Sequence, residues 1–240
     1  MNIKGVKFMK KIFIICTLVW LGLISNAFSA DFDKGWDAYE AGDYTTALKE
    51  WRPLAEQGDV DAQYNLGVIY EDGLGVIQDY QEAVKWYRLA AVQGNVNAQF
   101  NLGLMYRNGN GVLQDDKEVV KWYRLAAEQG HVQAQNNLGL MYKNGEGVIQ
   151  DYKEAVKWYS LAAEQGHDSA QNNLGQMYRK GTGVIQDKVY AHMWYNIAAS
   201  QGAKIAITNR DLLVKQMTAS QIEKAQDLAR QCVSNNYKGC

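Results

Sequence analysis

Small and aromatic residues recur at helical spacing along most of this chain. In residues 61–73, Ala62, Leu66 and Tyr70 are each four positions apart, which places them on one face of an α-helix. Residues 79–94 carry alanines and a Trp-Tyr pair at spacings of three and four, so they predict a second amphipathic helix. No stretch alternates with period two, and the chain contains one proline. The pattern therefore predicts an all-α protein.

The two predicted helices recur every 36 residues. The spacing is kept by Trp86, Trp122, Trp158 and Trp194, and by Gly58, Gly94, Gly130, Gly166 and Gly202. A unit of two short helices cannot bury its apolar face alone, so the repetition predicts a stacked array. We assign four repeats to residues 59–94, 95–130, 131–166 and 167–202, a shortened leading repeat to 31–58, and capping helices to 203–240.

A Gly-x-Gly pair stands between the two helices of each repeat, as Gly73 and Gly75 in the first. A phosphate-binding loop needs a strand before the glycines, whereas here a helix precedes them, so we interpret the pair as a turn. The first glycine suits the left-handed residue that ends a helix. Asp79, followed three positions later by Glu82, predicts a capping box at the start of the next helix.

A further glycine, Gly67 in the first repeat, falls inside a predicted helix, where glycine costs about 1 kcal/mol relative to alanine. We expect it to permit a close crossing with the helix that carries Trp and Tyr, so the aromatic stripe is packing and no cofactor is expected. His131 and His167 are one repeat apart, or ~10 Å, too far to share a metal ion. We expect both to cap or flank helices, and His192 to lie at the surface.

The first 30 residues predict a secretory signal. Four lysines precede the apolar run Ile12–Ile24, and small and polar residues follow it. This run is shorter than the ~20 residues that span a bilayer, so stable membrane insertion is not expected, although a retained anchor is the alternative. We expect an exported protein of the bacterial cell envelope, periplasmic or secreted. In an oxidising compartment Cys232 and Cys240 predict a disulfide, with free thiols as the alternative.

Charge argues against a nucleic-acid partner. Without residues 1–30 the chain keeps 21 basic residues against 26 acidic ones, a net charge of −5. Binders of nucleic acids usually show a basic face or stripe, and the sequence contains none.

The repeats closely resemble the Sel-1-like repeat family, which is related to the tetratricopeptide repeats. The resemblance rests on segments such as AQYNLGVIYEDGLGVIQDYQEAVKWYRLAAVQG and AQNNLGLMYKNGEGVIQDYKEAVKWYSLAAEQG, and it spans residues 59–202. It implies a right-handed superhelical solenoid with the first helix of each repeat on the concave side. It also implies a scaffold for protein partners.

In that arrangement, positions of the first helices that packing does not use would line a groove. They are Tyr64, Asn65, Val68, Glu71, Phe100, Asn101, Leu104, Arg107, Asn136, Asn137, Leu140, Lys143, Asn172, Asn173, Arg179 and Lys180, with Asp72, Asn108, Asn144 and Gln176 in the same rows. The groove would change from aromatic and acidic to amide-lined and basic. By analogy with tetratricopeptide grooves, the Asn residues would hold a peptide backbone. The basic residues would hold an acidic segment or a terminal carboxylate.

The alternative is that these charges form a solvated face and that the Asn residues are structural. We predict an exported, non-enzymatic and monomeric scaffold that binds a protein or peptide. Some cysteine-rich relatives are β-lactamases or penicillin binders, which gives an enzymatic alternative. The chain after residue 30 lacks the Ser-x-x-Lys and Lys-Thr-Gly motifs of that chemistry and has no cysteine pair in each repeat. An adaptor for peptidoglycan or envelope assembly is a further possibility that the sequence leaves open.

Overall fold

A computed structural model describes residues 30–240 of the chain. Over this range it contains twelve α-helices and no strand, which confirms the all-α prediction. The helices are α2 (Phe32–Glu40), α3 (Tyr44–Glu56), α4 (Val60–Asp72), α5 (Tyr80–Val92), α6 (Val96–Asn108), α7 (Asp116–Glu128), α8 (Val132–Asn144), α9 (Tyr152–Ala163), α10 (Asp168–Lys180), α11 (Lys188–Ser200), α12 (Lys204–Val214) and α13 (Ala219–Ser234). Residues 1–29, which are all but the last residue of the predicted signal, lie outside the described residues.

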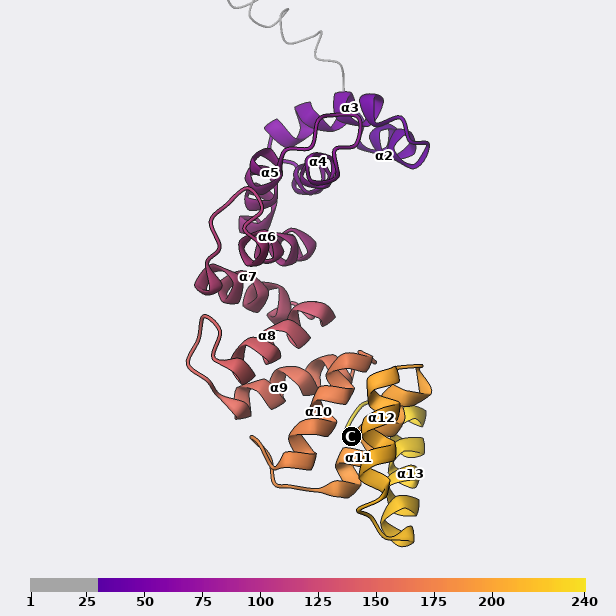
Figure 1. The fold of residues 1–240 in the computed structure, drawn as a ribbon. Helices are drawn as coiled ribbons and strands as arrows, with labels where there is room; N and C mark the ends of the chain where they lie inside the picture. The colour runs from indigo at the N-terminus through magenta and orange to yellow at the C-terminus, as the bar shows by residue number, and fades with distance from the viewer. Residues whose placement is uncertain (1–29) are drawn as a thin grey trace, which may run out of the picture.

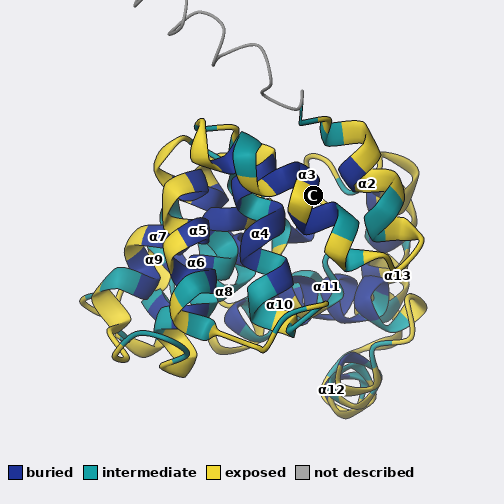
Figure 2. Cartoon of the chain, turned by 90° about the horizontal axis from the view of Figure 1, so that it is seen from above, coloured by how far each residue is buried: buried dark blue, intermediate teal, exposed yellow. Residues whose placement is uncertain are grey.

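Consecutive helices pack on one another and stack into an open arc, so the predicted solenoid is confirmed (Figure 1). Helices α4, α6, α8 and α10 form an inner layer, and α5, α7 and α9 form an outer one (Figure 2). The core runs between these layers and includes the buried Trp86, Trp122, Trp158 and Trp194. The pair α2 and α3 closes one end of the stack, and α12 and α13 close the other by packing on α11.

In each of the four repeats, a glycine of the first helix faces a tyrosine ring of the second. A Cβ added to Gly67 of α4 would lie 2.4 Å from Cδ1 of Tyr87 in α5, and the corresponding distance from Gly139 to Tyr159 is 2.8 Å. The other two repeats place Gly103 on Tyr123 and Gly175 on Tyr195 in the same way. The expected close crossing is present, and the ring against the backbone is the tyrosine of the Trp-Tyr pair.

The two glycines of the Gly-x-Gly pair in each loop have different structural roles. Gly73 ends α4 in the left-handed conformation with φ 69°, and its N–H donates to the Ile69 carbonyl, as predicted. The second glycine connects successive repeats. Gly147 has φ 67°, and a Cβ there would lie 2.2 Å from the carbonyl oxygen of Asp116, at the start of α7 in the preceding repeat.

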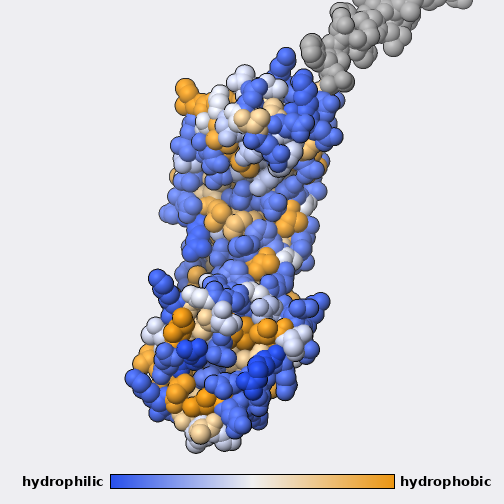
Figure 3. All heavy atoms as spheres, turned by 90° about the vertical axis from the view of Figure 1, so that its right-hand side faces the viewer, coloured by the Kyte–Doolittle hydropathy of each residue, from blue (hydrophilic) through white to orange (hydrophobic). Residues whose placement is uncertain are grey.

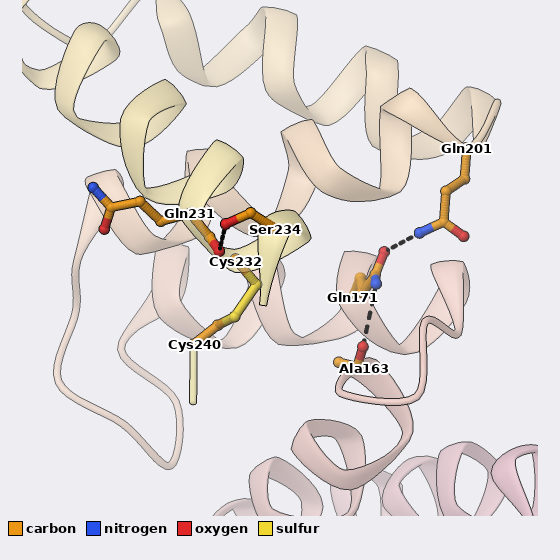
Figure 4. The surroundings of a disulfide bond; sticks show 7 residues. All are labelled: Ala163, Gln171, Gln201, Gln231, Cys232, Ser234 and Cys240. Atoms are coloured by element: carbon orange, nitrogen blue, oxygen red, sulfur yellow. Dashed lines mark hydrogen bonds between the residues drawn. A yellow bond between two sulfur atoms is a disulfide. The ribbon is translucent and has the colours of Figure 1, made fainter. Parts of the chain in front are cut away.

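A buried ladder of glutamines also joins neighbouring repeats. Gln135 in α8 donates from Nε2 to the Ala127 carbonyl of α7 at 3.0 Å, and its Oε1 accepts from Nε2 of Gln165 at 2.8 Å. Gln171, Ala163 and Gln201 form the same rung one repeat later (Figure 4). The remaining rungs are Gln63 with Ala55 and Gln93, and Gln99 with Ala91 and Gln129. Each rung ties three helices together and fixes how one repeat sits on the next.

The predicted capping box at Asp79 is only half correct. The Asp79 carboxylate accepts from the N–H groups of Gln81 and Glu82, so the cap is present. Its own N–H donates to the Tyr70 carbonyl at 2.9 Å and is therefore not available to Glu82. Glu82 pairs with Lys85 instead, and Asp115 and Asp151 repeat the arrangement. A complete capping box occurs at Thr218 and Gln221, at the start of α13.

The C-terminal helices correct one expectation. His192 in α11 is only 1% exposed, because α12 and α13 cover the outer helix of the last repeat, whereas we expected it at the surface. Behind α13 the chain turns back, with a Cα–Cα distance of 5.5 Å between Cys232 and Cys240 (Figure 4). That distance suits the predicted disulfide, whose formation stays a prediction.

Replacing Gly147 with alanine should destabilise the protein by about 2 kcal/mol or more, since it adds a left-handed alanine and a clash with a backbone carbonyl. Gly130→Ala is the matched control, because Gly130 also has positive φ but no atom lies within 4 Å of its added Cβ. Urea unfolding followed by circular dichroism measures both. Equal losses would show that the contact with Asp116 contributes nothing.

Histidine caps make a second prediction. Nδ1 of His131 and of His167 accepts from the N–H of Ala134 and Ala170 at 3.2 Å, in the place that Asp59 and Asn95 occupy in the earlier repeats. Burial lowers the pKa of both imidazoles from 6.5. The caps therefore stabilise the fold fully above pH 6.5, and this contribution is lost as the pH falls through the folded-state pKa.

We expect the double variant His131→Asn/His167→Asn to lose less stability than the wild type between pH 7 and pH 5, by about 1 kcal/mol per cap. Thermal unfolding across this range measures it. Parallel pH profiles for the two proteins would contradict the assignment.

Candidate peptide-binding groove

The predicted groove residues lie on the inner helices, but not all are accessible. The half-buried members are Tyr64, Val68, Glu71, Phe100, Asn101, Leu104, Asn136, Asn137, Leu140, Lys143 and Asn173, and the exposed members are Arg107, Arg179 and Lys180. Asn65 and Asn172 are each only 8% exposed and therefore belong to the packing between helices. Figure 3 views the open side of the arc, where hydrophobic residues are scattered over a largely hydrophilic surface.

Part of the asparagine series bonds within the protein. Asn173 of α10 donates from Nδ2 to Oδ1 of Asn136 in α8 at 3.2 Å. Asn209 of α12 donates to Oδ1 of Asn172 at 2.8 Å. The first bond joins two inner helices and the second joins α10 to the closing helix α12, so these amides serve the structural role that was the alternative. Oδ1 of Asn137 accepts from Nδ2 of Asn136 at 3.4 Å, and Asn101 is half-buried on the inner surface.

Aromatic side chains mark the N-terminal half of the surface. The Phe100 ring stacks on the His131 ring with centroids 4.3 Å apart, and it lies 5.5 Å from the ring of Tyr123. Tyr64 lies 5.9 Å from Tyr87 in the same way one repeat earlier. In the next two repeats these positions hold Asn136 and Asn172, so the aromatic character ends in the middle of the arc.

The sign of the charge changes between the first repeat and the others at one structural position. Glu71 accepts a hydrogen bond of 2.6 Å from the Tyr87 hydroxyl. Burial raises the pKa of Glu71, and this hydrogen bond opposes the shift. The corresponding residues of the next three repeats are Arg107, Lys143 and Arg179. The corresponding hydroxyls, of Tyr123, Tyr159 and Tyr195, are buried and have no hydrogen-bond partner among the described residues.

A cavity of about 530 Å³ lies where the third and fourth repeats meet. It is lined by Lys143, Asn144, Gln150, Tyr152, Gln176, Met177, Lys180 and Thr182. Two ammonium groups and three amides surround it, and no carboxylate is among its lining residues. The chemistry suits an anionic or strongly polar group.

Sequence reasoning found four of these lining residues and missed Gln150 and Thr182 in the loops, Tyr152 at the start of α9 and the buried Met177. Gln150 is the clearest omission: its Nε2 donates to the Lys143 carbonyl at 2.9 Å and thereby caps the end of α8. Gln78, Gln114 and Gln186 make the same bond in the other repeats. The sequence signal for this bond was the glutamine that directly precedes the helix-capping aspartate in every repeat.

Two searches of residues 30–240 bear on other classes of function. No group of three or more His, Cys, Asp or Glu residues in this part of the chain is arranged to hold a metal ion. None of its helices has both the length and the apolar character required to cross a membrane.

Comparison with known proteins agrees with this geometry. The family model for the Sel1 repeat matches residues 60–95, 96–131, 132–167 and 168–202. The chain belongs to the Sel1 repeat family. The matched units of this Sel1 repeat protein begin one residue after our boundaries, at the first residue of each inner helix instead of its cap. No curated protein matches it.

The solved structures similar to this Sel1 repeat protein include two of high similarity. One is a protective antigen present in uropathogenic Escherichia coli strains that displays an SLR fold, with 39% identity over 89% of this chain and a TM-score of 0.75. This chain spans only 48% of that antigen. The other is a Sel1 repeat protein from Oxalobacter formigenes, with 34% identity, 85% coverage of both chains and a TM-score of 0.74.

Glu71 of this Sel1 repeat protein offers a test of the charge inside the groove. Its raised pKa means that its contribution to stability is fully present below its ordinary value of 4.5 and is lost as the pH rises through the folded-state pKa. Glu71→Gln keeps an acceptor for Tyr87 without the charge. It should raise stability at pH 7 by less than about 1 kcal/mol, because the site is only half-buried.

Urea unfolding at pH 7 and pH 4 measures the effect, and the difference from wild type should vanish at pH 4. Tyr87→Phe is the companion variant and should lower stability by about 1–2 kcal/mol, since it removes the hydrogen bond to a half-buried carboxylate. A less stable Glu71→Gln at pH 7 would contradict the burial argument.

Proposed function

We propose that this protein is an exported, non-enzymatic adaptor that binds a protein or peptide partner along its inner surface. Sel1 repeat solenoids typically act as scaffolds for protein interactions. The predicted signal in residues 1–30 supports export, as does the relationship to a protective antigen. The partner would lie in extended form across α4, α6, α8 and α10.

One observation carries the proposal: the side chains that packing leaves free on the inner helices change systematically along the arc. The positions used for packing are nearly identical in every repeat, whereas Glu71 is followed by Arg107, Lys143 and Arg179 at the same structural position. Packing does not require this change, because the same contact between a glycine and a tyrosine ring joins the two helices in every repeat. The packing is the same in every repeat while the charge of the inner surface changes along the solenoid. Such a surface suits an elongated ligand whose own charge differs between its two ends.

The direction of that ligand follows from charge. Arg107, Lys143, Arg179 and Lys180 favour an acidic segment or a terminal carboxylate in the C-terminal half of the groove. The cavity between the third and fourth repeats supplies Lys143 and Lys180 together with amide groups, which suits a carboxylate. The aromatic residues Tyr64 and Phe100 would contact the apolar part of the partner.

Charge reversal tests this proposal. The double variant Lys143→Glu/Arg179→Glu should reduce capture of partners from a cell-envelope fraction at least tenfold, because each change replaces attraction by repulsion. Captured proteins are compared by quantitative mass spectrometry between immobilised wild type and variant.

A matched control changes the net charge equally on the outer helices. Lys85→Glu/Lys117→Glu alters two exposed lysines of α5 and α7 and should leave capture unchanged. Equal capture by wild type and the groove variant, with both proteins folded by circular dichroism, would refute the groove.

A further inference from the structure

The buried tyrosine hydroxyls are the part of the inner surface that packing leaves unexplained. We propose that Arg107 with Tyr123, and Arg179 with Tyr195, form two carboxylate-binding positions for side chains of an acidic peptide. The inference rests on the proposed function and specifies the chemistry that the groove recognises. It assigns a binding role to tyrosines whose rings serve the fold.

The first repeat shows what such a hydroxyl binds. Tyr87 donates to the carboxylate of Glu71, which the chain itself supplies from the end of α4. Repeats two and four hold the same tyrosine against the same glycine, but the residue at the position of Glu71 is an arginine. An arginine has donors only, so the hydroxyl hydrogen is left without an acceptor. Glu71 therefore occupies the place that a ligand carboxylate would take in the other two repeats.

The surroundings of these hydroxyls fit that role. Tyr123 and Tyr195 are 0% exposed, and their hydroxyls have no hydrogen-bond partner among residues 30–240. A buried unpaired hydroxyl is unfavourable, and native proteins rarely keep one without a reason. Burial raises the pKa of both tyrosines, and the nearby guanidinium groups oppose this shift, that of Arg107 at Tyr123 and that of Arg179 at Tyr195. The Asn137 amide also lies beside the Tyr123 hydroxyl and acts in the same direction.

Access to the hydroxyls depends on the arginines. Arg107 and Arg179 are exposed, so their side chains can turn toward a ligand and uncover the groups beneath. A carboxylate that enters would accept one hydrogen bond from the hydroxyl and others from the guanidinium. Such charge-assisted bonds are stronger than those between neutral groups.

The spacing of the two positions predicts the spacing of the ligand's acidic residues. Successive inner helices are about 10 Å apart, so Tyr123 and Tyr195, two repeats apart, are separated by roughly 20 Å. An extended peptide advances about 3.3 Å per residue, so the two carboxylates should be about six residues apart.

The test uses a synthetic peptide of glycine and serine with two glutamates six residues apart, acetylated and amidated at its ends. Its binding to a protein that comprises residues 31–240 is measured by isothermal titration calorimetry. Tyr123→Phe and Tyr195→Phe should each weaken binding about tenfold, because each removes one hydrogen bond to a charged group. Both variants should unfold at or above the wild-type temperature, since each removes an unpaired hydroxyl.

Tyr87→Phe is the matched control. Its hydroxyl is already bonded to Glu71, so this variant should bind the peptide like wild type while unfolding at a lower temperature. A peptide with glutamine in place of glutamate, and one with glutamates three residues apart, should bind at least tenfold more weakly.

Three results would overturn the inference: no binding of the probe to wild type, wild-type affinity in Tyr123→Phe and Tyr195→Phe, or an equal loss in Tyr87→Phe. The proposed function fails separately. If the groove charge reversal abolishes partner capture while both phenylalanine variants capture normally, the groove is correct and the hydroxyls take no part in recognition.

Discussion

The contact between a helix backbone and a tyrosine ring governs the architecture of this protein. Each inner helix has a glycine where the next outer helix places its tyrosine, and even a methyl group there would fall within 2.8 Å of the ring. Removing the side chain brings the two helices close together. The ring then reaches through to the inner surface, where its hydroxyl arrives beneath residues such as Glu71 or Arg107. The contact between glycine and tyrosine thus also places the tyrosine hydroxyl at the candidate site.

The repeat made most of the fold predictable. Helix periodicity, the glycine that ends each inner helix and the aspartate caps are local signals, so Gly73 and Asp79 could be interpreted without knowledge of tertiary contacts. The capping box at Glu82 failed because a distant carbonyl, that of Tyr70, uses the N–H that the box requires. The prediction that His192 lies at the surface was wrong for a similar reason, since α12 and α13, which bury it, come later in the chain. The glutamine ladder was missed because its bonds cross the turns between helices and join residues eight or 30 positions apart.

The candidate site was less predictable than the frame. Helical projection placed Phe100, Arg107 and Lys143 on the inner layer, but it could not separate accessible amides from those that bond between helices. Asn172 is buried because α12, outside the repeats, donates an amide to it. Loop residues such as Gln150 and Thr182 reach the cavity through turns whose path the helical pattern does not describe.

The glutamine ladder has a consequence for how such a chain can change its length. Gln135 donates to Ala127 of the preceding repeat and accepts from Gln165 of its own repeat, so every rung is completed by the unit before it. An in-frame duplication of 36 residues would therefore recreate these bonds at the one new junction, between the two copies. Gene duplication can therefore lengthen the inner surface of the solenoid by whole repeats, and the longer protein needs no new kind of interface between repeats.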